Sequence, residues 1–261
     1  MLELVPLPAF SDNYIWLFRA PGSAQAGVVD PGDAGPVLRY LQQHGLQLEA
    51  ILLTHHHADH IGGVQDLLNH SPVPVYGPRT PRIPFVTRAV AAGDLVTVAG
   101  MCFEVLEIPG HTLEHIAFFG PASGDMHEPL LFCGDTLFGA GCGRMFEGSP
   151  PMMYASLQGL ASLPPHTRVC CAHEYTLSNL RFAAVVMPDN AAVRARVARD
   201  QALRDAGKPT LPSYLADELA TNPFLRCSRP EVVASAQLHS GRSLNDAASV
   251  FGALRSWKDS F

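Results

Sequence analysis

The stretch Thr54-His55-His56-His57-Ala58-Asp59-His60 follows directly on the apolar run Ala50-Ile51-Leu52-Leu53. The apolar run predicts a buried strand, and the stretch behind it carries four imidazoles and a carboxylate. Burying such groups without partners costs on the order of several kcal/mol each, so they do not continue the core. The tip of a strand that faces solvent or a metal ion is the natural place for them. The stretch therefore indicates a metal site at the end of a strand.

The spacing inside this stretch indicates two adjacent metal ions rather than one. His55 and His57 stand two residues apart, so in extended backbone their side chains project to the same side. Asp59 continues that side, and His60 leaves it as the chain turns into Ile61-Gly62-Gly63. One loop thus offers two sets of ligands.

Three later segments each place one His or Asp at or near the end of a short predicted strand. They are Pro109-Gly110-His111-Thr112, Phe132-Cys133-Gly134-Asp135-Thr136 and Cys171-Ala172-His173-Glu174. This is the usual position for a site built on a β scaffold. We predict that His55, His57 and His111 form one ligand shell. We predict that Asp59, His60 and His173 form the other, with Asp135 as the bridge.

Nitrogen and carboxylate ligands without a thiolate suit Zn(II), Fe(II) or Mn(II). We therefore expect two divalent metal ions per chain, with zinc as the first choice and iron or manganese as alternatives. The competing interpretation is a histidine-rich tract that binds adventitious metal on a disordered loop. The flanking strand and the three downstream segments argue against it.

The metal motif and several longer segments resemble a known family. The pattern His55-x-His57-x-Asp59-His60 resembles the signature of the metallo-β-lactamase superfamily. The longer matches resemble one branch, glyoxalase II, the hydroxyacylglutathione hydrolases, from about Asp12 to Asp259. These matches are Asp12-Asn13-Tyr14, Val29-Asp30-Pro31-Gly32, Pro109-Gly110-His111-Thr112, Gly134-Asp135-Thr136-Leu137-Phe138, Gly141-Cys142-Gly143-Arg144, Glu147-Gly148, Ala172-His173-Glu174-Tyr175-Thr176, Thr221-Asn222-Pro223-Phe224 and the basic pair Arg255-x-x-Lys258.

The element pattern changes along the chain. Residues 1 to about 170 alternate short apolar strands, such as 13–19, 27–30 and 49–53, with a few helices, which favours α/β layers over a doubly wound sheet. Helical patterns then cover 183–186, 191–206, 214–220, 231–238 and 244–257. The resemblance implies a four-layer αββα metallo-β-lactamase-like sandwich with a small C-terminal helical domain. We expect a catalytic domain over 1–172 and a helical substrate-binding domain over 173–261.

The expected chemistry is hydrolysis by a hydroxide that two metal ions generate from water at neutral pH. Asp59 would bind one metal and orient that hydroxide, and Asp135 would hold the metals together, so both are predicted catalytic residues. The sequence contains no Gly-x-Ser-x-Gly nucleophile elbow. The resemblance implies that the substrate is S-D-lactoylglutathione, cleaved to D-lactate and glutathione in the second step of methylglyoxal detoxification.

Five residues are expected to contact the substrate. Arg144 ends the glycine-rich segment 139–144, whose backbone amides could approach a peptide-like substrate, although an ordinary turn has the same composition. Tyr175 follows His173 by two residues, and Phe146 stands where some family members carry a tyrosine that contacts glutathione. Arg255 and Lys258 share a helix face and match carboxylate-binding positions of the family, whereas such a pair alone is usually a solvated surface.

Composition limits the partners. A net charge of −6 offers no broad basic footprint for nucleic acid, and no apolar stretch reaches the roughly 18 residues that span a bilayer. Cysteines in apolar strands suggest reduced thiols, so we expect a cytoplasmic monomer that acts on a small-molecule glutathione thioester, without nucleic-acid or membrane partners.

Two other activities compete with this interpretation. A glutathione-persulfide dioxygenase on the same scaffold shares the metal motif but should consume oxygen. A nucleic-acid phosphodiesterase of the superfamily is disfavoured by the acidic charge balance. A β-lactamase is disfavoured by His60 and by the absence of a secretion signal.

Overall fold

The computed structural model describes residues 2–122 and 128–261, and the chain divides into two compact units. The first unit takes in the chain up to Glu107 together with Glu114–Gly134 and Arg168–His173. The second unit consists of Ile108–Leu113, Asp135–Thr167 and Glu174–Phe261. Two stretches of the second unit therefore interrupt the strands of the first along the chain.

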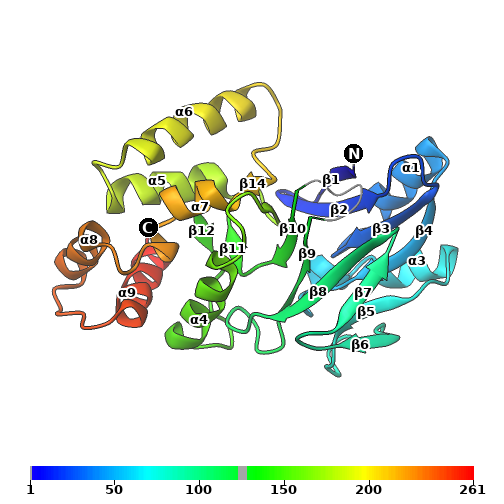
Figure 1. Ribbon diagram of the computed structural model, residues 1–261, viewed down its shortest axis with the longest axis horizontal. Coiled ribbons are helices and arrows are strands. Elements are labelled where there is room, and N and C mark those ends of the chain that lie inside the picture. Colours follow the sequence, from blue (N-terminus) through cyan, green and yellow to red (C-terminus); the bar gives the residue numbers. More distant parts are fainter. Residues whose placement is uncertain (1, 123–127) are drawn as a thin grey trace. The chain divides into compact units, whose positions relative to one another are not determined.

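The first sheet of the first unit is mixed, and its strands lie in chain order (Figure 1). It contains β1 (Glu3–Ala9), β2 (Asn13–Arg19), β3 (Gln25–Val29), β4 (Gln47–Leu52), β5 (Val75–Pro78) and β6 (Arg88–Val90). The first three strands pair antiparallel, and β3 to β6 pair parallel. Strand β1 lies at the edge of the sheet, where Pro6 and Pro8 are tolerated because an edge strand has one side without ladder bonds.

Helix α1 (Ala34–His44) packs against this sheet, and a capping residue lies at each of its ends. The Asp33 carboxylate accepts a hydrogen bond from the Gly35 amide at 2.8 Å, and Gly45 ends the helix with φ of 63°. Its residues Val37 and Leu41 share a buried apolar cluster with residues of β3 and β4. The short helix α2 (Ala58–Ile61) and α3 (Val64–His70) follow β4.

The second sheet has the order β13-β10-β9-β8-β7 within the first unit. Its strands are β7 (Leu95–Val98), β8 (Met101–Glu107), β9 (Ile116–Gly120), β10 (Leu130–Gly134) and β13 (Arg168–Cys171). Only β10 and β13 pair parallel among these five strands. Strands β7 and β8 form a hairpin that turns at Ala99 and Gly100, which both have positive φ.

An aromatic cluster joins the two sheets face to face. Phe18 of β2 contacts Phe103 of β8 and Phe132 of β10, with ring centroids 5.3 and 5.4 Å apart, and all three rings are fully buried. Large rings fill the space between two sheets efficiently and add edge-to-face attraction. The predicted α/β class is confirmed.

The second unit is mostly helical. It contains α4 (Pro150–Ala161), α5 (Thr176–Val186), α6 (Ala191–Asp205), α7 (Leu215–Thr221), the 3₁₀ turn η1 (Pro223–Leu225), α8 (Pro230–Ser240), α9 (Ala247–Asp259), the strand pair β11 (Leu137–Phe138) and β12 (Gly141–Cys142), and the short β14 (Ser213–Tyr214). Phe182, Phe224 and Phe251 form its aromatic core. The predicted C-terminal helices are confirmed.

Two helices differ from the sequence expectation. Helix α5 begins at Thr176 and is longer than the predicted 183–186. Helix α4 lies outside the helical patterns predicted from the sequence, and it begins with Pro150 and Pro151. Proline is in fact favourable in the first helical turn, where its missing N–H has no intrahelical partner, so Ser149 followed by prolines is the signal that could have found α4.

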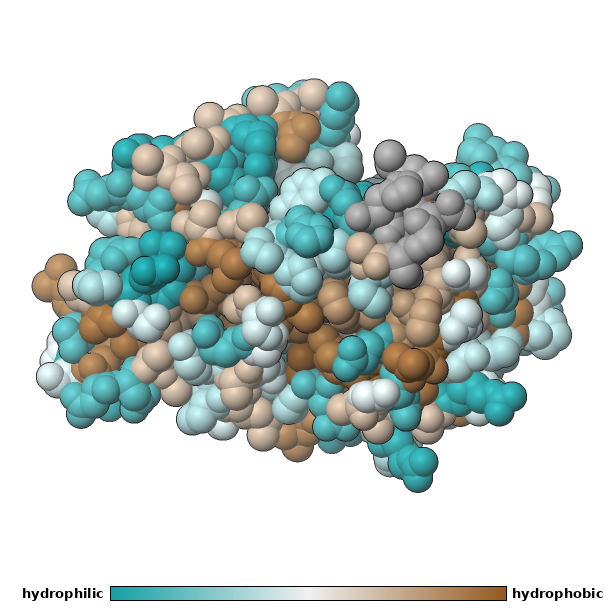
Figure 2. All heavy atoms as spheres, in the orientation of Figure 1, coloured by the Kyte–Doolittle hydropathy of each residue, from teal (hydrophilic) through white to brown (hydrophobic). Residues whose placement is uncertain are grey.

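Helix α6 exposes most of its length, and Figure 2 shows mostly hydrophilic and weakly apolar side chains along it. Its buried positions are Val193, Arg196 and Asp200, so its inner face carries charge as well as an apolar contact. None of the helices in the described ranges combines the length and apolar composition needed to cross a membrane.

Candidate metal centre and substrate pocket

The histidine loop after β4 is fixed to the end of β3. Asp30, which is buried and has φ of 50°, accepts hydrogen bonds from the Thr54 amide at 2.8 Å and the Thr54 hydroxyl at 2.7 Å. Thr54 is fully buried, so its two donors need these acceptors. This anchor sets the direction in which His55 and the residues after it leave the sheet.

One group of predicted ligands lies within the first unit: Asp59, His60 and His173. The Nε2 atoms of His60 and His173 lie 3.6 and 3.5 Å from Asp59 Oδ2. Their Nδ1 atoms face other carboxylates, at 3.0 Å from Asp30 and 2.8 Å from Asp12. A carboxylate that accepts the Nδ1 proton leaves the Nε2 lone pair for a metal ion. The three ligand atoms lie close enough together to share one cation.

A second pair within the first unit is His55 and His57. His55 Nε2 lies 3.1 Å from His57 Nδ1, and His55 is fully buried. Two imidazole nitrogens bound to one tetrahedral zinc ion lie about 3.3 Å apart, from Zn–N distances of about 2.0–2.1 Å. The His115 ring stacks on the His55 ring at 4.5 Å, and its Nδ1 donates to the Ile116 carbonyl.

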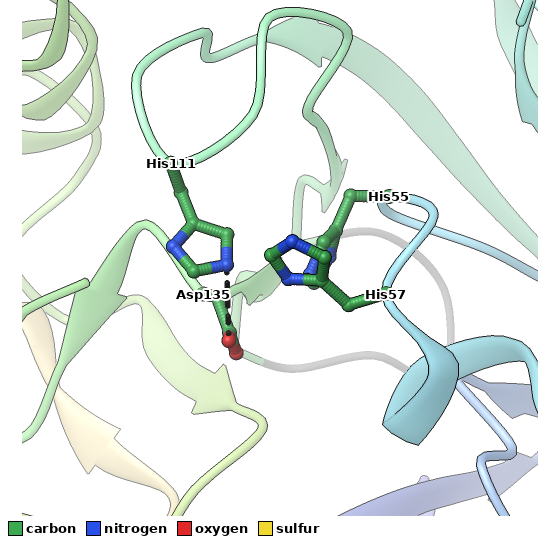
Figure 3. Close-up of side chains that lie close together, drawn as sticks. All are labelled: His55, His57, His111 and Asp135. Carbon is green, nitrogen blue, oxygen red and sulfur yellow. Dashed lines mark hydrogen bonds and ion pairs between the residues drawn. The ribbon is translucent and has the colours of Figure 1, made fainter. Parts of the chain in front are cut away.

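The third pair, His111 and Asp135, lies within the second unit. Figure 3 shows these two side chains with His55 and His57, and its dashed line joins His111 Nε2 to Asp135 Oδ2, which are 3.4 Å apart. His111 Nδ1 donates to the Arg144 carbonyl at 2.7 Å, so Nε2 is again the atom that carries the lone pair.

Two glycines permit close approaches beside these ligands. A Cβ on Gly143 would lie 1.9 Å from the Asp135 carbonyl oxygen, which only glycine avoids. Gly134 ends β10 with φ of 47°, and a Cβ there would lie 2.4 Å from Thr54 Oγ1. The end of β10 therefore lies against the first residue of the histidine loop, and Asp135 is the next residue along the chain.

The five predicted substrate contacts line one cavity of about 370 Å³ in the second unit. These are Arg144, Phe146, Tyr175, Arg255 and Lys258, and His111 and Asp135 line the same cavity. A larger cavity of about 610 Å³ beside His239 and Trp257 holds none of the predicted site residues. The smaller cavity is the better candidate, because the predicted metal ligands His111 and Asp135 line it together with the predicted substrate contacts.

The two basic residues of α9 differ in the contacts that they make with the rest of the chain. Arg255 is buried, and its guanidinium donates to the Cys142 carbonyl at 2.9 Å and to Asp259 at 3.0 Å. Lys258 lies above the rings of Phe182 and Phe261. Burial, followed by the charges of nearby arginines, lowers the pKa of Lys258 below its usual value. This concentration of positive charge favours an anionic ligand.

Tyr175 and Phe146, two aromatic residues of the cavity, differ in their ring contacts and in their exposure to solvent. Tyr175 packs edge-on against Phe138, with centroids 5.4 Å apart. Phe146 is 65% exposed, and its ring lies 5.3 Å from the His111 ring. Phe146 is therefore the more accessible of the two to a bound molecule.

Sequence reasoning missed the residues that hold the ligands. Asp12 and Asp30 hold His173 and His60, and Asn13 donates to Asp59 Oδ2 at 3.0 Å. All three stand at the end of a strand or at its start, within the matched segments Asp12-Asn13-Tyr14 and Val29-Asp30-Pro31-Gly32. Polar residues at strand ends near a metal loop were the signal that could have found them.

Comparison with known proteins identifies the family. Residues 10–173 match the model of the metallo-β-lactamase superfamily, and residues 174–261 match that of the hydroxyacylglutathione hydrolase C-terminus. A hydroxyacylglutathione hydrolase of Xanthomonas campestris pv. campestris (strain B100) is 54% identical over 261 residues, covering 100% of this chain and 99% of the relative.

Two solved structures are also similar. The crystal structure of ETHE1 from Myxococcus xanthus has a TM-score of 0.65 at 23% identity, over 99% of this chain and 98% of that chain, a likeness that shows the fold. The crystal structure of TTHA1623 in a di-iron-bound form has a TM-score of 0.53 at 32% identity, over 66% of this chain and 91% of that chain. Taken with the family models and the full-length relative, these likenesses show that the chain belongs to the hydroxyacylglutathione hydrolases of the metallo-β-lactamase superfamily.

Proposed function

We propose that the chain hydrolyses the thioester S-D-lactoylglutathione to D-lactate and glutathione, the second step of methylglyoxal detoxification. One observation carries the proposal: a single cavity of the second unit gathers His111 and Asp135 with Arg144, Tyr175 and Lys258. Glutathione carries two carboxylates, so its thioester suits a cavity rich in cations beside metal ligands. The name of the Xanthomonas relative supports the same substrate class.

The residues present fit two divalent metal ions. We propose His55, His57 and His111 as one ligand shell, Asp59, His60 and His173 as the other, and Asp135 as the bridge. Imidazoles whose Nδ1 atoms face carboxylates or a carbonyl support this assignment, as does the position of Gly134 against Thr54. The donor set accepts zinc, iron or manganese, and TTHA1623 has been crystallised in a di-iron-bound form.

The chain's own residues would orient the metal ligands and would not themselves make or break bonds of the substrate. Two bound divalent cations would supply an acidified water and polarise the thioester carbonyl. Asn13 orients the Asp59 carboxylate, while Asp12 and Asp30 hold the rings of His173 and His60 at their Nδ1 atoms. The leaving thiolate departs without obligatory protonation, so the cavity needs no general acid.

A covalent route through a cysteine is disfavoured. Cys142 lines the cavity, but burial raises the pKa of its thiol to about 11, against an opposing effect of Arg255. The thiol is then protonated at neutral pH, and the thiolate is the nucleophilic form. We therefore propose direct hydrolysis without an acyl-enzyme.

We also propose a role for each domain and a cellular compartment for the protein. Residues 1–172 would form the catalytic domain, and residues 173–261 would form the substrate-binding domain. The six cysteines, which all lie within the described residues, are thiols, which fits a reducing cytoplasm. We propose that the chain acts there as a monomer on a small molecule, without a nucleic-acid partner.

The test is an assay of the purified, metal-loaded protein. We expect loss of S-D-lactoylglutathione and stoichiometric release of D-lactate and glutathione, without oxygen uptake. The same preparation is given glutathione persulfide in an oxygen electrode, as the control for the rival dioxygenase. Oxygen uptake without thioester cleavage would overturn the proposal.

Phe146 provides a prediction about affinity. We expect Phe146→Tyr to lower KM for the thioester about two- to tenfold, because a new hydroxyl contact contributes about 0.5–1.5 kcal/mol. The ring lines the cavity and is largely exposed, so the added oxygen can be accommodated. Steady-state kinetics measure the change, with Phe146→Leu as the control that keeps an apolar side chain without a hydroxyl. An unchanged KM for Phe146→Tyr would show that the substrate does not reach this ring.

A further inference from the structure

A buried polar network in the second unit ends on the two-residue turn of the β11–β12 hairpin. Glu218 of α7 is fully buried and accepts a hydrogen bond from the Ala140 amide at 2.7 Å. Asn222, also fully buried, donates to the Gly141 carbonyl at 2.8 Å. Asn179 of α5 donates to the Gly139 carbonyl at 3.0 Å. The side chains of Asn179, Glu218 and Asn222 therefore hold two peptide groups of the hairpin, the one between Gly139 and Ala140 and the one that follows Gly141.

The turn is held in a conformation that it would not favour by itself. Ala140 has φ of 53°, the left-handed region that costs a residue with a Cβ. A Cβ on Gly141 would lie 2.3 Å from Asn179 Nδ2, so the helix approaches the hairpin as closely as a glycine allows. A residue stays in such a strained backbone conformation only where several contacts with its surroundings hold it there.

Each oxygen of the Glu218 carboxylate accepts two hydrogen bonds. Its Oε1 accepts from Arg196 and Ser213, each at 2.7 Å, and its Oε2 accepts from Ala140 and Asn222. Burial disfavours the charged guanidinium of Arg196, but Glu218 and Asp200 outweigh it and raise the pKa of Arg196. Buried ion pairs are weak evidence for stability, since apolar groups of the same shape often serve as well. The arrangement of this one around a single turn suggests a role in conformation.

The hairpin connects this network to the cavity. Phe138, which directly precedes the turn, and Cys142, which ends β12, both line the cavity. Phe138 packs against Tyr175, and the Cys142 carbonyl accepts the hydrogen bond from Arg255. A shift of the turn would therefore move the groups that would meet the thioester.

We propose that Glu218 and Asn222 are positioning residues for substrate binding, which hold the β11–β12 hairpin in the conformation that shapes the cavity. This inference rests on the proposed function, because it takes the cavity to be the site of the glutathione thioester. Neither residue lines the cavity, so both act through the hairpin.

The test compares Glu218→Gln with Asp200→Asn. Glutamine keeps the shape of Glu218 but turns an amide group toward donors on one side, so one contact of the carboxylate is lost. Asp200 is also fully buried in the network, where it accepts from Arg196 and Arg199, but no hydrogen bond joins it to the hairpin. Both variants should lower the melting temperature, whereas only the first should disturb the turn.

We expect Glu218→Gln to raise KM for S-D-lactoylglutathione and the calorimetric Kd for glutathione about tenfold, with kcat within about threefold of wild type. Asp200→Asn should leave KM and Kd unchanged. Hydrogen exchange of the peptide that contains Ala140 should be faster in Glu218→Gln than in Asp200→Asn. Metal content should equal that of wild type in both variants.

The outcomes separate the inference from the proposed function. If wild type neither cleaves the thioester nor binds glutathione, the proposed function fails. If wild type does both and Glu218→Gln keeps its KM and its exchange rate, the positioning role is wrong. Should Glu218→Gln not fold, Asn222→Ser gives the same readouts through the Gly141 carbonyl, and an unchanged Kd there overturns the inference.

Discussion

Replacing Asp135 with Asn is expected to reduce kcat for S-D-lactoylglutathione at least ~100-fold, and to lower the metal content below two ions per chain. Asp135 is buried beside His111, directly after the end of β10. Asparagine has nearly the same shape but no negative charge, so it offers a bridge between two cations much less stabilisation. Metal analysis and steady-state kinetics on the same preparation measure both effects.

Asp66→Asn is the matched control for this variant. Asp66 is exposed on α3, so the same chemical change there should alter neither metal content nor kcat. A fully active protein with one metal ion per chain, whether wild type or Asp135→Asn, would contradict the proposed role of Asp135 as a bridge.

The second large effect concerns the basic pair of α9. We expect Arg255→Ala with Lys258→Ala to raise KM about ten- to a hundredfold, because charge-assisted contacts contribute roughly 1.5–3 kcal/mol. The change in kcat should stay within a few-fold, the signature of lost uniform binding. The increase in KM should be smaller for a thioester that lacks the glycine carboxylate, because the basic pair then has no carboxylate to bind. Lys208→Ala with Arg242→Ala removes the same charge from exposed positions of the second unit and should leave KM unchanged.

The single variants separate binding from structure. Arg255 already donates to Cys142 and Asp259, so Arg255→Ala should also lower the melting temperature. Lys258→Ala should raise KM with little loss of stability, because Lys258 is partly exposed. If the double variant keeps its KM and loses only thermal stability, the pair is structural.

The pH dependence of binding follows from the lowered pKa of Lys258. Burial, followed by Arg255 and two other arginines, disfavours the charged ammonium, so the lysine loses its proton at a lower pH than usual. The cationic form binds the carboxylate, so this contribution is present below that pKa and lost as pH rises through it. The alkaline fall of kcat/KM should therefore begin below the range of an ordinary lysine, with a pKa of about 10.4. Lys258→Ala should remove this component of the profile.

Features encoded by neighbouring residues could be predicted from the sequence. The short apolar strand predicted over 13–19 coincides with β2, the apolar run before Thr54 overlaps β4, and α1 is bounded by the cap residues Asp33 and Gly45. Helical spacing and a strand period of two are local signals. The spacing of His55, His57, Asp59 and His60 predicted a metal site for the same reason, and that assignment remains a prediction.

The tertiary structure decided which distant residues meet. Asp12 holds His173 across 161 positions, Glu218 meets the Ala140 amide across 78, and Arg255 reaches the Cys142 carbonyl across 113. No periodicity encodes such pairs, since each depends on how the strands and helices pack. Sequence alone therefore determined most of the elements, the family resemblance and the candidate ligands. The fold determined the carboxylates that orient the imidazoles and the network that holds the hairpin, because hydrogen bonds between distant residues form only once packing brings donor and acceptor together.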